Sequence, residues 1–158
     1  MDISAMAGHL IRRLHQHSAA VFQAQTKAAG LDLTPVQFAA LGAVRDSPGI
    51  DQAGIASRIA YDRATIGGVI ERLVLKGLLR REVSATDRRA RSVHLTEAGA
   101  ETLARALPVV VAAQPEILSG LTEAETAQFH ALARKVLNSL DAPETPRPSP
   151  ASEGGAPR

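Results

Sequence analysis

Basic side chains gather in one short stretch of this 158-residue chain. Between Arg58 and Arg91 nine lysines and arginines face four acidic residues, although the whole chain carries a net charge of only +2. The stretch therefore has five excess positive charges and the remainder of the chain is at −3. Such a separation indicates one surface for an anionic partner, the alternative being arginines that only solvate a surface.

Histidines form the second group with possible chemistry. His9, His15 and His17 crowd the N-terminal segment, with Arg12 and Arg13 among them. A metal site is not expected, since His15 and His17 lie about 200° apart on a helix and cannot reach one ion. The chain has no cysteine, which removes disulfides and thiolate ligands and is compatible with a cytoplasmic protein. Nothing in the sequence resembles a signal peptide, and no apolar run approaches the roughly 20 residues that span a bilayer, so neither is expected.

A helix followed by a hairpin must position the basic stretch. Asp62 is a suitable N-cap, the apolar residues from Ile66 to Leu73 repeat at helical spacing, and Gly77 suits the helix end, so we expect a helix over 62–76. Two strands, 79–83 and 92–95, are predicted by alternating apolar and polar residues, with a cationic loop over 84–91 between them. This is the layout of a winged helix that grips a polyanion.

Two shorter helices are predicted before this unit. Thr34, Pro35 and Gln37 make a capping box with proline at the first helical position, and Asp51 caps the next helix. Tyr61 fills the turn that leads to Asp62. The order is that of a helix-turn-helix.

Longer helices are expected at both ends. One covers 2–29, and after the hairpin Thr96 caps a second helix that runs towards Gly120. Thr122 and Glu125 form a capping box for a third helix, whose apolar stripe extends from Phe129 to Leu140. Few partners within the chain remain for these apolar faces, so we expect them to pack against a second copy. The proline-rich residues 141–158 are expected to be a disordered tail.

The motifs around the hairpin resemble the MarR family of bacterial winged-helix regulators. The run DRRARSVHLTEAG over 87–99 follows GLLRR, and in it Asp87, Arg89 and the Leu95-Thr96-x-x-Gly99 motif match the wing pattern of that family. Upstream, Ile55-Ala56 and 62–65 resemble its helix-turn-helix, and the likeness covers about residues 5 to 140. The resemblance implies a mainly α protein with a small β-hairpin wing. The implied regions are an N-terminal dimerisation helix over 1–33, a winged helix-turn-helix over 34–98 and C-terminal dimerisation helices over 99–140.

The same resemblance assigns candidate DNA contacts. Arg63 and Thr65 would meet base edges in the major groove, and Arg88 and Arg89 would enter a minor groove. Asp87 would hold the wing arginine in place. Gly67 and Gly68 replace the side chains common in the family, which removes readout but lets the backbone approach DNA. The complete set of expected DNA-binding residues is Ser57, Arg58, Arg63, Thr65, Gly68, Arg72, Arg88, Arg89 and Arg91.

Members of the family often bind small anionic aromatic effectors beside the dimerisation helices. The residues that would suit an aromatic carboxylate here are His9, Arg13, His15, His17, Phe38 and Tyr61, unless the histidines are ordinary surface residues. The sequence looks most like the branch that represses nicotinate degradation, so a hydroxylated pyridine carboxylate is the first expected ligand. No cofactor is expected.

The implied function is a homodimeric, ligand-responsive repressor of transcription that binds a palindromic operator in double-stranded DNA. Two alternatives remain: a sequence-independent architectural DNA-binding protein, and, more remotely, a hydrolase or metal enzyme built on the histidines. The enzyme alternative has little support, because the sequence contains no HExxH, GxSxG or P-loop motif.

Overall fold

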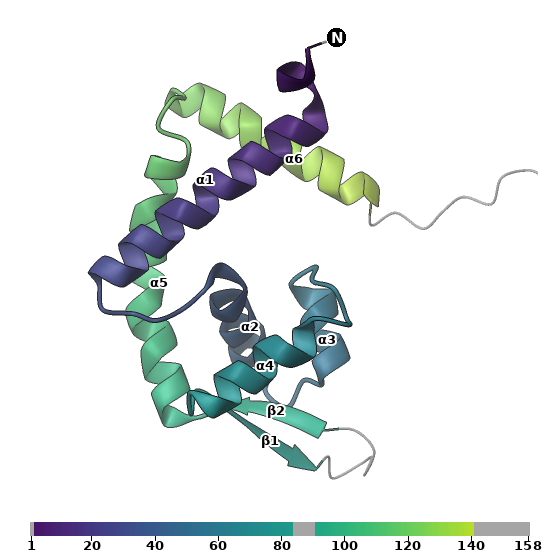
Figure 1. Cartoon of the computed structure of the whole chain (residues 1–158), viewed down its shortest axis with the longest axis vertical. Helices are drawn as coiled ribbons and strands as arrows, with labels where there is room; N and C mark the ends of the chain where they lie inside the picture. Colours follow the sequence, from purple (N-terminus) through teal and green to yellow (C-terminus); the bar gives the residue numbers. More distant parts are fainter. Residues whose placement is uncertain (1, 84–90, 141–158) are drawn as a thin grey trace, which may run out of the picture. The chain divides into compact units, whose positions relative to one another are not determined.

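The computed structural model describes residues 2–83 and 91–140, which form two units divided between Leu118 and Ser119. The expected wing tip, with Asp87, Arg88 and Arg89, and the expected tail lie outside the described residues. Six α-helices and a two-stranded antiparallel hairpin confirm the predicted fold class (Figure 1). In chain order the elements are a 3₁₀ turn Ile3–Ala5, α1 Ala7–Ala28, α2 Pro35–Asp46, α3 Gln52–Arg58, α4 Ile66–Leu75, β1 Leu79–Val83, β2 Arg91–Leu95, α5 Glu97–Ile117 and α6 Glu123–Leu140.

The core of the first unit forms where α2, α3 and α4 meet the hairpin. The apolar face predicted for α4 is buried, as are Ile55 and Ala56 of α3. Burying each large aliphatic side chain contributes roughly 1.5–3 kcal/mol. Both predicted caps are present: Thr34 and Gln37 form the capping box of α2, and the Asp51 carboxylate accepts from the Gly54 N–H. The packing therefore follows from the helical spacing of apolar residues.

Asp62 makes the predicted cap bond, but α4 begins at Ile66, four residues after the predicted start of the helix. Asp62 Oδ2 accepts from the Thr65 N–H at 2.9 Å, and the Asp62 main-chain oxygen accepts from the Ile66 N–H at 3.0 Å. These local bonds close a turn over 62–65, and α4 begins only at Ile66. Arg63 and Thr65 consequently lie on a turn in front of the helix and not within it.

The N-terminal helix is also shorter than predicted. Met6 has an extended backbone, φ −73° and ψ 136°, which separates the 3₁₀ turn Ile3–Ala5 from α1. Asp2 accepts from the Ser4 N–H and so stabilises the short turn. The cap at Asp2 thus starts a separate turn before α1.

The hairpin pairs Leu79 with Leu95 and Val83 with Arg91. On the outer edge of β2, Val93 donates to the Ile50 oxygen and accepts from the Gly49 N–H, both at 3.0 Å. Gly49 has a φ of +82°, a conformation that favours glycine, and this conformation lets the chain turn against β2 before α3 begins. The hairpin base is thereby attached to the helix-turn-helix.

A second junction joins the hairpin to α5. Thr96 donates its hydroxyl to the Gly77 oxygen at 2.6 Å and its N–H to the Leu78 oxygen at 3.1 Å, and it caps α5 through the Gly99 N–H. Gly99 lies directly against this strand start: a Cβ there would sit 2.0 Å from the Leu78 oxygen. This contact gives a physical reason for the glycine in the Leu-Thr-x-x-Gly motif.

Helix α1 packs against α5, and α5 also contacts α2 and β2 (Figure 1). Gln25 of α1 donates to Glu116 of α5 at 2.7 Å, and the rings of Phe22 and Phe38 lie 5.9 Å apart. Within the described ranges, no helix has the length and hydropathy needed to cross a membrane.

The second unit contains α6. Its predicted capping box is confirmed, because Glu125 Oε2 accepts from the Thr122 N–H at 2.8 Å and Thr122 Oγ1 accepts from the Glu125 N–H at 3.3 Å. None of its side chains is fully buried, and its apolar stripe leaves Leu132, Val136 and Leu137 exposed.

Candidate nucleic-acid interface and ligand hollow

Helix α4 presents a bare strip of backbone opposite its buried face. Gly68 is exposed, and a Cβ built on it would meet nothing within 4 Å. At Gly67 a Cβ would instead lie 3.0 Å from the amide nitrogen of Gln52, which reaches over from the start of α3. The exposed Arg72 stands one turn further along, and Arg63 and Thr65 are exposed on the preceding turn. The side chains expected to contact DNA therefore flank a surface made of backbone.

Arg58 is engaged by the end of α2. Its guanidinium donates to Ser47 Oγ at 2.9 Å and lies 3.8 Å from Asp46 Oδ2, while neighbouring Ser57 is exposed. A hydrogen bond from Arg45, with the charges of Arg45 and Arg58, holds the pKa of Asp46 below its ordinary value. Arg58 thus braces α3 against α2 as well as standing at the surface.

The alternation of the hairpin sorts its arginines onto two faces. On the outer face Arg80 pairs with Glu82, and His94 lies 3.6 Å from Glu82 and 3.2 Å from Ser92 Oγ. On the inner face Arg81 is paired with the buried Val93, and Arg91 lies two residues before Val93 on the same strand. These two arginines and Arg63 line an open hollow of about 410 Å³, the arginine hollow, whose other residues are Asp51, Gln52, Ala53 and Val93.

A smaller hollow of about 140 Å³, the α1–α5 hollow, lies between α1, α5 and the start of α2. Its polar lining is His15, Ser18 and Gln114. Apolar residues complete it, namely Ala19, Phe22, Pro35, Val110, Ala113 and Ile117.

Of the residues predicted to bind an effector, His15 lines this hollow. Phe38 is not part of the lining but packs against Phe22, which is, with the two rings tilted by 58°. His9, Arg13 and His17 are on other faces of α1, and Tyr61 is in the turn between α3 and α4. The structure therefore does not bring these six residues together.

Sequence reasoning missed Ser18 and Gln114. The signal was present: the lining residues of α1 and those of α5 each follow the spacing i, i+3, i+4, i+7. Among the residues that the structure describes, no group of three histidine or acidic side chains could hold a metal ion.

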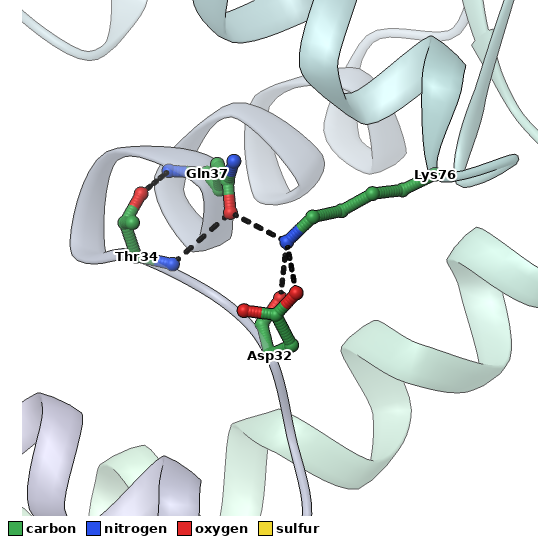
Figure 2. A network of polar contacts seen from close by, with 4 residues as sticks. All are labelled: Asp32, Thr34, Gln37 and Lys76. Carbon is green, nitrogen blue, oxygen red and sulfur yellow. Dashed lines mark hydrogen bonds and ion pairs between the residues drawn. The ribbon is translucent and has the colours of Figure 1, made fainter.

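A polar network links the start of α2 to the end of α4 (Figure 2). Lys76 Nζ donates to the main-chain oxygen of Asp32 at 2.7 Å and lies 3.5 Å from Gln37 Oε1. The same Gln37 oxygen accepts from the Thr34 N–H at 3.1 Å. Because Pro35 lies between these two cap residues and also lines the α1–α5 hollow, the hollow and α4 share this contact region.

Comparison with known proteins agrees with this geometry. A sequence profile of the MarR family matches residues 31–90. The chain is 34% identical to the transcriptional regulator HosA of Escherichia coli over 88% of this chain and 100% of HosA. It is 35% identical to the transcriptional repressor NicR of Pseudomonas putida, over 87% of this chain and 86% of NicR.

Among solved structures, the fold is similar to that of BpsR from Bordetella bronchiseptica, described in a study of how 6-hydroxynicotinic acid regulates its DNA binding. The TM-score is 0.80 at 33% identity, covering 90% of this chain and 99% of that one. The winged-helix geometry and the identity over nearly the whole described chain lead to one conclusion: this protein belongs to the MarR family of transcriptional regulators.

Proposed function

We propose that the protein is a homodimeric repressor that leaves a palindromic DNA site when a small aromatic carboxylate binds. The observation that carries the effector part is the α1–α5 hollow. A cavity of about 150 Å³ holds one benzene ring, so a hollow of about 140 Å³ suits a single aromatic ring.

The lining of this hollow favours a polar ring over a plain hydrocarbon. Phe22, Val110 and Ile117 offer apolar contact, while His15, Ser18 and Gln114 can bond to ring nitrogen, hydroxyl or carboxylate groups. A hydroxylated pyridine carboxylate has all three kinds of group on one ring. The regulation of BpsR by 6-hydroxynicotinic acid supports the same class of compound.

Apolar surface on three helices supports the dimer. Leu10, Ile11 and Leu14 are exposed on α1, and Leu107 and Val111 on α5, while α6 carries its own exposed stripe. Faces of this kind are the usual interfaces of symmetric dimers. Two copies of α4 would then meet major grooves about one helical turn of DNA apart.

Release from DNA requires the effector to favour one spacing of the two DNA-binding units. Pro35 places the first turn of α2 against the α1–α5 hollow, and the Lys76 network joins that turn to α4. A ligand that displaced Pro35 would therefore act on the helix that we assign to the major groove.

The test is a footprinting titration of the purified protein on promoter DNA from its own genome, with and without 6-hydroxynicotinic acid. We expect a discrete protected palindrome that weakens as the acid is added. Gln114→Leu should abolish the response to the acid and leave DNA binding in its absence intact. The control Ala112→Leu, an exposed change on a face of α5 outside the hollow, should respond normally. An unchanged response in Gln114→Leu would reject the hollow as the effector site.

The architectural alternative draws on one observation, the bare backbone at Gly68, which offers no side chain for base readout. Uniform protection along the duplex, without a palindrome, would favour it.

A further inference from the structure

We propose that the arginine hollow is a seat for one backbone phosphate of duplex DNA, on the strand that divides the major groove from the adjacent minor groove. This inference rests on the proposed DNA binding and names a site within it. Arg81 and Gln52, which are not among the DNA-binding residues expected from the sequence, are assigned to this seat with Arg63 and Arg91.

The alternation of side chains along β1 separates two neighbouring arginines. Neighbouring side chains of a strand point to opposite faces, so Arg80 and Arg81 are directed to different surroundings. Arg80 is neutralised by Glu82 on the outer face. Arg81 shares the inner face with Arg91 and is paired with the buried Val93, and both arginines line the same hollow as Arg63. Three guanidinium groups from three separate segments therefore converge on one hollow.

The arginine hollow carries an excess of positive charge. Within the described ranges, no carboxylate lies in ion-pair distance of Arg63, Arg81 or Arg91. The carboxylate of Asp51, which also lines the hollow, accepts the Gly54 N–H at 2.7 Å as the cap of α3. Among the described residues that line the hollow, three arginines outnumber this carboxylate, and such an excess of positive charge favours the binding of an anion.

The hydrogen-bond donors that line the hollow suit the geometry of a phosphate. Guanidinium groups bind phosphate with two parallel hydrogen bonds, and the Gln52 amide adds a neutral donor at the wall of the hollow. That amide lies against Gly67, where an added Cβ would sit 3.0 Å from the amide nitrogen. The glycine thus leaves room for Gln52 at this position.

The expected path of the DNA backbone also leads to this hollow. If α4 enters the major groove and the hairpin reaches the adjacent minor groove, the sugar-phosphate strand between the two grooves passes between these elements. The arginine hollow suits that position, since its walls are the start of α3, the turn before α4 and the inner face of the hairpin. A hollow of about 410 Å³ leaves room for a phosphate and its flanking sugar atoms.

The experiment compares Arg81→Gln with Arg80→Gln. The two variants remove one positive charge each, from adjacent residues of the same strand, so general electrostatic attraction changes equally. We expect Arg81→Gln to weaken operator binding about tenfold and to reduce the slope of log K against log salt by about one. Arg80→Gln should change the affinity by no more than about twofold and the slope by much less than one.

A second arm identifies the phosphate. Operators with a single uncharged methylphosphonate at successive positions are tested for loss of wild-type affinity. At the phosphate between the grooves the loss should be large for wild type and for Arg80→Gln, and small for Arg81→Gln, because the seat is already damaged. Equal losses in all three proteins would overturn the assignment.

The two levels of the proposal fail differently. A wild-type protein that binds no duplex in dilute buffer would refute the proposed function. Wild-type binding with indistinguishable Arg80→Gln and Arg81→Gln variants would refute only the phosphate seat. Thermal stabilisation by millimolar inorganic phosphate that depends on Arg81, with unchanged operator binding by Arg81→Gln, would assign the hollow to a free anion and also overturn the proposal.

Discussion

Lys76 Nζ lies 2.7 Å from the main-chain oxygen of Asp32 and 2.7 Å from its carboxylate Oδ2, across 44 positions of sequence. The lysine is the C-cap of α4, and Asp32 lies in the link between α1 and α2. The end of α4 is thereby fixed to the segment that enters the capping box of α2 (Figure 2). Two bonds of equal length do not contribute equally, however, because their surroundings differ.

We expect Lys76→Met to lower the free energy of unfolding by about 1–2 kcal/mol, and Asp32→Asn to lower it by less than about 0.5 kcal/mol. The Asp32 side chain is 95% exposed, so its ion pair is screened by water, whereas the Lys76 side chain is 31% exposed. The bond to the main-chain oxygen survives in Asp32→Asn. Methionine keeps the apolar stem of the lysine, so the loss of stability in Lys76→Met reports the contribution of the ammonium group.

Urea unfolding at neutral pH measures both changes. Equal losses in the two variants would show that the exposed carboxylate, and not the main-chain oxygen, is the important partner of Lys76.

Gly99→Ala should destabilise the protein by about 1–3 kcal/mol or more, since the added Cβ would lie 2.0 Å from the Leu78 oxygen and backbone cannot give way cheaply. The control is Gly42→Ala, also within a helix, where a Cβ meets nothing within 4 Å. There, alanine should stabilise the helix by up to about 1 kcal/mol. A Gly99→Ala variant as stable as Gly42→Ala would contradict the junction described between β1 and α5.

Local signals in the sequence predicted the elements well where one residue decides the outcome. Gly77 has a φ of +70° at the end of α4, and Thr34, Asp51 and Thr96 cap the helices expected of them. At Asp62 the sequence predicted the cap bond correctly but placed the start of the helix four residues too early. An aspartate that caps a turn and one that caps a helix offer the same carboxylate, so the sequence does not separate the two.

Contacts between distant segments were not predictable in the same way. The hollow-lining stripes of α1 and α5 are each visible in the sequence, but nothing local says that His15 and Gln114 face one another. The pairing of Lys76 with Asp32 likewise depends on how α4 packs beside α2. Helical spacing gives the face of an element, whereas the partner of that face is set by the whole core.

Glu125 should titrate below its ordinary pKa of 4.5, because the Thr122 N–H and hydroxyl both donate to its carboxylate. A lowered pKa means that the charged cap stabilises α6 above pH 4.5 and that this contribution is lost as the pH falls through the lowered value. Carbon-detected NMR of the carboxyl group gives the value directly. In Thr122→Ala the pKa should rise toward the ordinary value, and a pKa that does not move would exclude the hydroxyl as a cause.

Gly68→Ala should make the protein more stable and a weaker DNA binder at the same time. Alanine is favoured over glycine in a helix by up to about 1 kcal/mol, and at this position its Cβ has open space, so the melting temperature should rise. On DNA the same methyl group would keep the α4 backbone from the close approach that we assign to this face. The control Gly8→Ala, in α1 with equally open space, should gain stability without losing affinity. If Gly68→Ala bound the operator as tightly as wild type, the glycine would be a source of flexibility and not a contact surface.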